Sequence, residues 1–433
     1  MAIDRTPGQR TDANTRYFDA AIRHQVGVRN LTTQQVNELI GLLETMDQDL
    51  TGKIRQRLKK FVGIPFNPRT KKFQDLLIEL RGIRSVALRE LEQKFRTNLI
   101  DLGKLEVDFE KRMMEGALPV VLDLESPSTQ TLTSLIATRP FGEGSVGGRN
   151  LRQWFQSLKQ SDQQRITGAI QAGLFQGEGI DEIVRRVVGR RSNGFRDGVL
   201  GLTRRQAEAV IRTAVNGISN TAREAVWAAN TDILQGLMWT AVLDGRTTAI
   251  CQSRDGKVAP IGDTALPSGT PRLEPPGARP PAHVACRSIM TAVFSSEGVM
   301  AAAGVRPFVR STKNARGRRL DFRKQAREQA GAEWTTLSRA ERNTRVASLR
   351  ENWGQRNIGT IPATVNYQEW LQRQPSSFQD SVLGKTKGEL FRTEKVGVDD
   401  FVTRRGNALT LEQLAQTDPT AFISAGLSPD NFL

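Results

Sequence analysis

Two long runs of apolar residues at helical spacing occupy the N-terminal third of the chain. Thr32 and Gln35 form a capping box, which predicts a first helix over residues 32–61. Its apolar positions recur every three or four residues: Val36, Leu39, Leu43, Met46, Leu50, Ile54 and Leu58. The second run has the same spacing: Phe73, Leu77, Leu80, Ala87, Leu91, Phe95, Leu99, Leu102, Leu105, Phe109 and Met113. Pro65 and Pro68 interrupt the pattern between the runs, so the sequence predicts a long antiparallel helical hairpin whose stripes are ordinary core.

Turn-forming residues near positions 123–150 mark the end of this region. Helical patterns resume in NLRQWFQSL, at residues 150–158, and Gly177 and Gly179 break them again. A further capping box, Thr203 with Gln206, predicts a helix over residues 203–230 with one apolar face.

After this helix, the residue pattern changes from one typical of helices to one typical of β-strands. The segment LMWTAVLD, residues 237–244, reads as a strand, and SIMTAVF, residues 288–294, reads as a closing strand. Turn-forming residues dominate residues 244–287 between them. An irregular stretch of this length inside a domain needs something that organises it.

The C-terminal third divides into a basic segment and a final module. Residues 306–350 carry thirteen Lys or Arg and four acidic residues, a net charge of +9, and read as helical. Residues 361–433 contain short helical pieces around Trp370, Phe378 and Leu390. We predict a mostly α protein with four regions: an N-terminal helical region at 1–145, a small α+β domain at 146–300, a basic helical linker at 301–360 and a helical module at 361–433.

Composition limits the function classes. The chain has 433 residues, a net charge of +16 and a pI of about 10.4, which indicates a polyanionic partner such as nucleic acid or an acidic protein surface. No apolar stretch is long enough to span a membrane, and the sequence MAIDRTPGQR has no apolar signal core. Two cysteines and two histidines rule out a disulfide framework and limit histidine-based catalysis. These features fit synthesis in a reducing cytoplasm.

Candidate chemistry is concentrated in the irregular stretch. Cys251, His283 and Cys286 carry the donor types that Zn²⁺ takes in tetrahedral geometry, and Asp244 or Asp255 could add an oxygen as the fourth ligand. One interpretation is a structural zinc site that ties the loop together. The other is two buried cysteines and a hydrogen-bonded histidine. In either case, we predict that Cys251, His283 and Cys286 converge and tie the two ends of the loop together. Pairing of the two strands should bring Cys251 and Cys286 to the same end, because each lies a few residues outside its strand.

The order of these residues resembles the phage Mu F-like head morphogenesis family. That family's pattern is a helix with Arg-Thr, a Trp-bearing strand, Asp-x-Arg-Thr, a Cys, Asp-Gly and finally Pro-Pro-x-His-x-x-Cys-Arg. The matching residues span roughly positions 195–295: Arg212, Thr213, Trp239, Asp244, Arg246, Thr247, Cys251, Asp255, Gly256, Pro280, Pro281, His283, Cys286 and Arg287. Many relatives have a second cysteine near the first site and end in Cys-Arg-Cys, whereas this chain has Cys251 alone and Ser288 at the last position.

The resemblance implies a structural minor capsid protein of a tailed phage, present in the procapsid and on the inside of the virion head after assembly in the host cytoplasm. It implies contact with the portal protein and with major capsid or scaffold proteins, and a role in head assembly or genome delivery. The basic segment favours contact with double-stranded DNA without sequence specificity. The residues expected to contact phosphates are Arg316, Arg318, Arg319, Arg323, Lys324 and Arg327.

The alternative is a nucleic-acid-processing enzyme carried in the virion, nuclease-like, that uses the Cys/His loop. A nucleophilic pair of Cys251 with His283 is conceivable. A nuclease of the HNH type needs more histidines than this loop has, and GEGSVGGR, residues 142–149, lacks the ending of a phosphate-binding loop. We therefore expect no enzymatic activity and no cofactor other than structural zinc.

Overall fold

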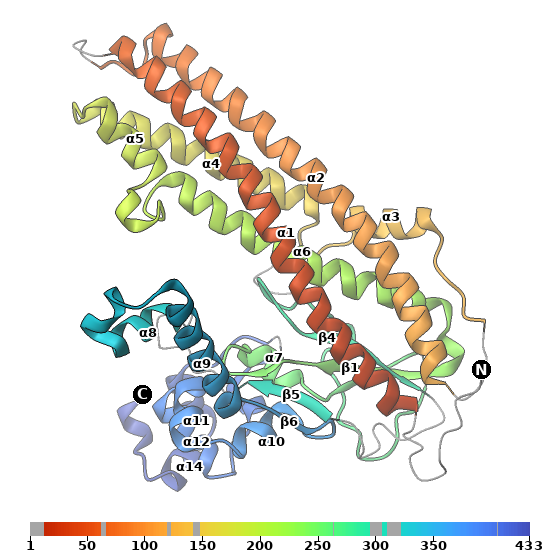
Figure 1. Cartoon of the computed structure of the whole chain (residues 1–433). Helices are drawn as coiled ribbons and strands as arrows, with labels where there is room; N and C mark the ends of the chain where they lie inside the picture. The colour runs from red at the N-terminus through yellow and green to blue at the C-terminus, as the bar shows by residue number, and fades with distance from the viewer. Residues whose placement is uncertain are drawn as a thin grey trace.

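A computed structural model describes residues 13–61, 66–118, 123–141, 148–262, 264–294, 305–309, 322–404 and 406–433. Within these residues, a long helical bundle extends away from two small sheets and a helical C-terminal module (Figure 1). This arrangement confirms the predicted class, mostly α with a small α+β part. Among the helices that the structure describes, none combines the length and apolar character that crossing a membrane requires.

The N-terminal hairpin is present and longer than predicted. It consists of α1 (Ala13–Leu58), the short η1 (Lys59–Phe61) and α2 (Lys71–Ala117), and α1 and α2 pack along each other. At 1.5 Å per residue, the 46 residues of α1 span about 69 Å. The predicted start at Thr32 is wrong, because Thr32 lies within α1 and its Oγ1 donates to the carbonyl oxygen of Val28 at 2.7 Å. The apolar pattern missed residues 13–31 because polar residues such as Asn14 and Gln25 are on their buried face.

Further helices complete the bundle. They are α3 (Thr129–Thr138), α4 (Leu151–Phe175), α5 (Ile180–Val188), η3 (Arg191–Asn193) and α6 (Val199–Ala229). Asn150 and Gln153 form a capping box that starts α4. The capping box predicted at Thr203 is wrong, because α6 begins at Val199 and Thr203 is a buried residue of the helix. Gly177, with φ +69°, allows the turn between α4 and α5.

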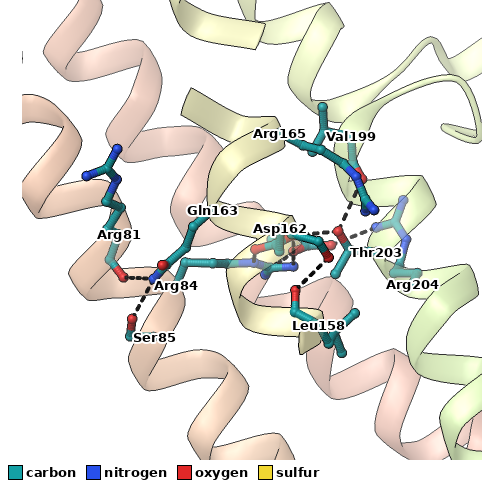
Figure 2. Close-up of polar contacts among 12 residues, drawn as sticks. Arg81, Arg84, Ser85, Leu158, Asp162, Gln163, Arg165, Val199, Thr203 and Arg204 are labelled. Carbon is teal, nitrogen blue, oxygen red and sulfur yellow. Dashed lines mark hydrogen bonds and ion pairs between the residues drawn. The ribbon is translucent and has the colours of Figure 1, made fainter. Parts of the chain in front are cut away.

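A charged cluster is buried in the middle of the bundle (Figure 2). Arg84 of α2 is 1 % exposed and pairs with Asp47 of α1 and Asp162 of α4, each at 2.6 Å. Thr203 of α6 donates to Asp162, and Arg204 of α6 pairs with Asp47 at 3.0 Å. The cluster therefore connects all four long helices at one level. The apolar periodicity gave no signal for it.

The first sheet has the strand order β3-β1-β4. After η4 (Thr231–Ile233), β1 (Leu234–Thr240) pairs antiparallel with β3 (Val258–Pro260) and with β4 (Ile289–Phe294). Trp239 of β1 is opposite Met290 of β4, so the predicted pairing of the two strands is confirmed. The backbone N–H of Met290 also donates to Oδ1 of Asn220 at 3.0 Å, which attaches the sheet to α6.

The segment predicted as one strand over residues 237–244 contributes to two sheets. β1 ends at Thr240, and β2 (Leu243–Asp244) belongs to a second sheet of order β2-β5-β6. Its other members are β5 (Val305–Val309) and β6 (Ile358–Pro362). β5 runs parallel to β2 and antiparallel to β6. The backbone groups of Ala241, between the sheets, bond to Asp255 and Arg306 instead of to a strand.

The C-terminal module packs on this second sheet. It contains α10 (Tyr367–Gln372), α11 (Ser376–Leu383), α12 (Lys385–Arg392), η6 (Val398–Phe401), α13 (Leu411–Thr417), α14 (Pro419–Ser424) and η7 (Pro429–Asn431). Its apolar core includes Tyr367, Trp370 and Phe391, together with Leu243 of β2.

The basic segment is only partly helical. Residues 306–309, predicted as helix, lie in strand β5. Helix begins at α8 (Phe322–Ala330) and continues through η5 (Gly331–Thr335) and α9 (Arg339–Asn357). Strand pairing with β6 accounts for the difference, because tertiary contacts override local helical propensity.

One apolar core extends from the hairpin to the first sheet. It includes Tyr17 of α1, Phe95 of α2, Phe155 of α4, Ile218 of α6 and Trp239 of β1. Residues on both sides of position 145 contribute to this one core. The domain boundary predicted at that position stays a prediction.

Candidate metal centre

Cys251 is on α7 (Ala249–Arg254), a short helix that follows the turn at Asp244. The carbonyl oxygen of Thr248 accepts hydrogen bonds from the backbone N–H groups of Cys251 and Gln252, each at 2.9 Å. The Gln252 side chain donates back to the carbonyl oxygen of Thr247 at 2.7 Å. These bonds fix the first turn of α7 and hold Cys251 in a buried position.

His283 and Cys286 are in a tight turn at the other end of the loop. The Cys286 N–H donates to the carbonyl oxygen of His283 at 3.1 Å. Ala285 has φ +55°, a left-handed conformation that is unfavourable for alanine. Its N–H donates to Oγ1 of Thr213 in α6 at 2.9 Å. The turn is therefore stabilised by α6, the helix that carries the Arg-Thr pair of the sequence pattern.

The structure brings the three candidate ligands together, as the sequence predicts. Sγ of Cys251 lies 3.7 Å from Sγ of Cys286 and 3.3 Å from Nε2 of His283, and all three ligand atoms lie within 4.8 Å of one another. Nδ1 of His283 lies 3.0 Å from the carbonyl oxygen of Val284. If Nδ1 carries the proton and donates to that oxygen, the lone pair of Nε2 is free to bind a metal.

The three side chains differ in their affinity for protons. Burial raises the pKa of Cys251, and the hydrogen bond to Cys286 raises it further. Burial acts in the same direction on Cys286, but hydrogen bonds from Cys251 and His283 outweigh it and hold the pKa of Cys286 well below its usual range. Burial lowers the pKa of His283, yet the hydrogen bond to Cys286 leaves it raised. The cluster thus favours a thiolate at Cys286, and Cys251 of the hypothetical nucleophilic pair keeps its proton.

Asp244 does not supply the fourth ligand that the sequence analysis considered. Arg287 donates to its two carboxylate oxygens at 2.5 and 2.7 Å, and the backbone N–H of Arg246 donates to Oδ1 at 2.9 Å. The Arg246 side chain is farther away, with Nε at 3.5 Å from Oδ2. Thr247 donates to the same carboxylate at 3.2 Å and to the carbonyl oxygen of Val242. Asp244 therefore holds the turn before α7, and its carboxylate is used by these donors.

Asp255 is used in a similar way. It accepts hydrogen bonds from the backbone N–H of Ala241 at 2.7 Å and from Arg306 of β5 at 2.8 and 3.0 Å. Arg306 also donates to the carbonyl oxygens of Ala241 and Val365. Gly256 follows with φ +80°, and its N–H donates to the carbonyl oxygen of Trp239. This carboxylate connects the loop of residues 244–287 to the second sheet, and its oxygens are used by these donors rather than by a metal.

Sequence reasoning missed the residues that reach this loop from later in the chain. Arg306 was counted only as part of the basic segment, although it is 3 % exposed. The Tyr367 hydroxyl donates to the backbone carbonyl oxygen of Asp244 at 2.9 Å. The Arg-Pro-Phe-Val sequence at 306–309, apolar apart from one cation, was a weak signal for a buried strand.

A groove of about 890 Å³ opens beside the candidate ligands. Its walls come from α1, from α6 and from the two ends of the loop, and Cys251, His283, Cys286 and Ser288 line it. Arg29 of α1 lines it too, and Nε of Arg29 is buried with no hydrogen-bond partner among the described residues. Burial, together with the nearby Arg287 and Arg246, lowers the pKa of Arg29 to about 10. No sequence signal marked Arg29, because α1 reaches the groove only in the folded chain.

The remaining residues of the sequence pattern are structural neighbours of the loop. Arg212 pairs with Glu208 on α6 at 2.8 Å, and Trp239 is buried beneath the guanidinium of Arg254, at 5.0 Å. Pro281 is buried and lies beside Gly217 of α6.

The predicted DNA-contact residues fall into two groups. Arg316, Arg318 and Arg319 lie outside the described residues. Arg323, Lys324 and Arg327 are exposed on α8, which lies apart from α7, the helix that carries Cys251, in Figure 1.

The central region is therefore a small domain in which helices of the bundle pack against the first sheet and the loop of residues 244–287. Residues 164–291, less than a third of the chain, match the family described as Phage Mu protein F like protein. This match supports the resemblance of the central region to a family of phage head morphogenesis proteins. No curated protein and no solved structure matches the chain.

Proposed function

We propose that the protein is a non-enzymatic minor capsid component that acts in head assembly or genome delivery of a tailed phage, in contact with portal protein and packaged DNA. The supporting observation is the apolar core that joins the family region to the long hairpin. Through this core the loop domain is firmly attached to a bundle about 69 Å long. A rigid helical bundle that shares a core with a domain is suited to holding that domain at a defined position in an assembly.

Portal contact is tested by pull-down with purified portal protein. The expected result is retention of this protein by portal, and its presence in both procapsids and mature heads. Absence of co-migration in both particles would refute the portal role. The exposed faces of the hairpin are the proposed contact, because amphipathic helices bind partners along such faces.

DNA contact is tested by the salt dependence of duplex binding. The proposal rests on the net charge of +9 in residues 306–350 and predicts weak binding without sequence preference that falls steeply with salt. A linker variant with Arg316, Arg318, Arg319 and Arg323 changed to Glu should bind more weakly. Equal binding by this variant and the parent would contradict contact through the linker.

The absence of catalysis is part of the proposal and has its own test. Purified protein incubated with duplex or single-stranded DNA and Mg²⁺ or Mn²⁺ should leave the DNA intact. Cleavage that disappears in a His283→Ala variant would instead support the nuclease alternative.

A further inference from the structure

The Cys/His cluster has the separations that one metal ion imposes. Two thiolates on a tetrahedral Zn²⁺, with Zn–S bonds of about 2.3 Å, lie about 3.8 Å apart. A thiolate and an imidazole nitrogen on the same ion lie about 3.6 Å apart. The observed Sγ–Sγ separation is 3.7 Å, and Sγ of Cys251 is 3.3 Å from Nε2 of His283.

A tetrahedral ion held by these three side chains has a fourth coordination position, and the groove that they line is the space open to it. Among the described residues, only Cys251, His283 and Cys286 form a group of three or more His, Cys, Asp or Glu side chains placed to hold one metal ion. Asp244 and Asp255 are held by arginines and backbone N–H groups. Ser288 also lines the groove, and its side chain hydrogen-bonds to Cys251. Three protein ligands and one accessible position are typical of zinc sites that bind water or an exogenous ligand.

The groove favours an anion in that position. Arg29, Arg246 and Arg287 all line the groove, and Asp244 is the carboxylate that offsets them. Burial lowers the pKa of Arg29, and the charges of Arg287 and Arg246 lower it further. Glu44 and Glu208 also line the groove, but they pair with Arg204 at 3.9 Å and with Arg212 at 2.8 Å. Within the described part of the chain, the buried Nε of Arg29 has no hydrogen-bond partner, so it can donate to a ligand in the groove.

We propose that Cys251, His283 and Cys286 bind one Zn²⁺ through Sγ, Nε2 and Sγ, and that its fourth coordination position faces the groove and accepts water or a carboxylate beside Arg29 and Arg246. The site differs from a closed structural zinc site in admitting a small ligand. A carboxylate of a partner protein is a ligand of this chemical class.

Metal content gives the first test, on the full chain purified without a metal-binding tag. Inductively coupled plasma mass spectrometry should find one zinc per chain, and Cys286→Ser and His283→Ala should lose it. The matched control is His24→Ala, which changes the chain's other histidine and should keep the zinc. Should the ligand variants fail to fold, zinc release from the parent on thiol modification gives the same information. A chain that binds no zinc, or that contains a Cys251–Cys286 disulfide by mass, overturns the proposal.

Cobalt substitution tests the open position. Co²⁺ in the parent should show thiolate charge-transfer and d–d absorption, and acetate should change the d–d bands. In Ser288→Cys the added thiol should close the site and remove the response to acetate. Arg29→Gln should weaken the acetate response without loss of metal. A parent spectrum that ignores acetate would show a closed site and overturn the open position.

A second inference comes from the distribution of charge. The distal tip of the bundle, defined as residues 51–61, 66–79 and 176–197, carries thirteen Lys or Arg and six acidic residues, a net charge of +7. Residues 306–350 carry +9, so these two regions account for the whole net charge of +16. The end of α1, the start of α2, and α5 lie together at the end of the bundle that is remote from the sheets (Figure 1).

The basic side chains of the tip are accessible. Arg55, Arg57, Arg185 and Arg186 form ion pairs, and within the described residues no ion pair is found for the other nine: Lys53, Lys59, Lys60, Arg69, Lys71, Lys72, Arg190, Arg191 and Arg196. A hollow beside them is lined by Arg55, Arg185, Arg190 and Arg191. Exposed cations brought together from three segments are suited to phosphates, which need no particular arrangement of donors.

We infer that the tip is a second surface for duplex DNA, in addition to the linker, and this inference rests on the proposed contact with packaged DNA. The tip variant changes Lys53, Lys59, Arg69 and Arg191 to Glu. A control variant changes Arg23, Arg96, Lys104 and Arg152, which are exposed elsewhere on the bundle, to Glu. Both alter the total charge equally, as does the linker variant.

Duplex binding of the four proteins is compared over a range of salt concentrations. The tip variant should bind about tenfold or more weakly than the control variant at low salt, with a shallower salt slope. Loss in the linker variant alone would overturn the tip and leave DNA contact in place. Loss in neither variant would overturn both proposals. Tip-dependent binding of polyglutamate without binding of DNA would assign the surface to an acidic protein and also overturn the inference.

Discussion

The helical bundle and the loop of residues 244–287 both bury charged side chains, but these side chains have different partners. In the charged cluster of the bundle, one cation serves two carboxylates, because Arg84 pairs with Asp47 and Asp162 on different helices. In the loop, each carboxylate pairs with a different arginine and also accepts a backbone N–H. Asp244 pairs with Arg287 and accepts the N–H of Arg246. Asp255 pairs with Arg306 and accepts the N–H of Ala241.

The difference follows from the backbone. Helical residues satisfy their own N–H and C=O groups, so a buried charge in the bundle fixes how helices align without supporting any backbone. The irregular loop leaves backbone groups without ladder partners, and its carboxylates replace those partners. Loss of a bundle charge should therefore lower global stability, whereas loss of a loop charge should also release local structure.

The largest effect is expected at Arg84. Arg84→Met keeps most of the side-chain volume but leaves Asp47 and Asp162 buried without their shared cation. The free energy of unfolding should fall by about 3–5 kcal/mol, measured by urea denaturation. Arg55→Met is the control, because Arg55 and Asp181 are 52 % and 75 % exposed, and it should cost less than about 1 kcal/mol. Addition of Asp47→Asn and Asp162→Asn to Arg84→Met should recover part of the loss, and equal costs for the two arginines would contradict this account.

A smaller effect is expected at Asp255 in the loop. Asp255→Asn leaves Arg306 buried without its carboxylate and weakens the bond to the Ala241 N–H, at a cost of about 2–3 kcal/mol. Hydrogen exchange should show faster exchange at Ala241 and in β5 than in the bundle. Asp399→Asn is the control, because Asp399 pairs with Lys257 and is half exposed. Uniform loss of protection over the whole chain would argue against a local role.

The same contrast explains how far the sequence could predict the molecule. The hairpin, α6 and the pairing of β1 with β4 follow from apolar periodicity, since each buries a regular face. The start of α1 was missed because Asn14 and Gln25 occupy its buried face. A pattern that treats polar residues as exposed cannot find a helix whose buried side contains them.

The candidate site was predictable in its ligands but not in its surroundings. The spacing of Cys251, His283 and Cys286 and the pairing of the strands indicated that the three would meet. Arg306, Tyr367 and Arg29 reach the loop from distant parts of the chain, so no local pattern points to them. Asp244 and Asp255 were considered as metal ligands because the sequence does not show which arginines hold them.

A pH dependence distinguishes the bundle from the loop. Burial raises the pKa of Asp47 to about 6, although Arg84 and Arg204 act in the opposite direction. The pKa in the folded protein then exceeds the value near 3.9 in the unfolded chain. The folded state binds the extra proton between these values, so this group's contribution to stability is full below about pH 4 and is lost as the pH rises through about 6.

Asp47→Asn should remove that slope. Between pH 4 and 6, the unfolding free energy of the parent should fall relative to that of Asp47→Asn as the pH rises. The slope of this fall should be at most about 1.4 kcal/mol per pH unit. For Asp244 burial also acts to raise the pKa, but the hydrogen bond and charge of Arg287 outweigh it, so Asp244→Asn should not reproduce this dependence. A parent and Asp47→Asn with parallel pH profiles would contradict the role of Asp47.

The smallest effects compare two threonines of α6. Thr203 donates to Asp162 in the bundle, and Thr213 accepts the N–H of Ala285 in the turn that holds His283 and Cys286. Thr203→Val should cost about 1 kcal/mol, because Asp162 keeps Arg84. Thr213→Val should cost about 1–2 kcal/mol, because a backbone N–H at a left-handed residue loses its acceptor. The decisive measurement is thiol alkylation under native conditions: Thr213→Val should expose Cys286 faster than Thr203→Val does, and equal alkylation rates would show that α6 does not hold the turn.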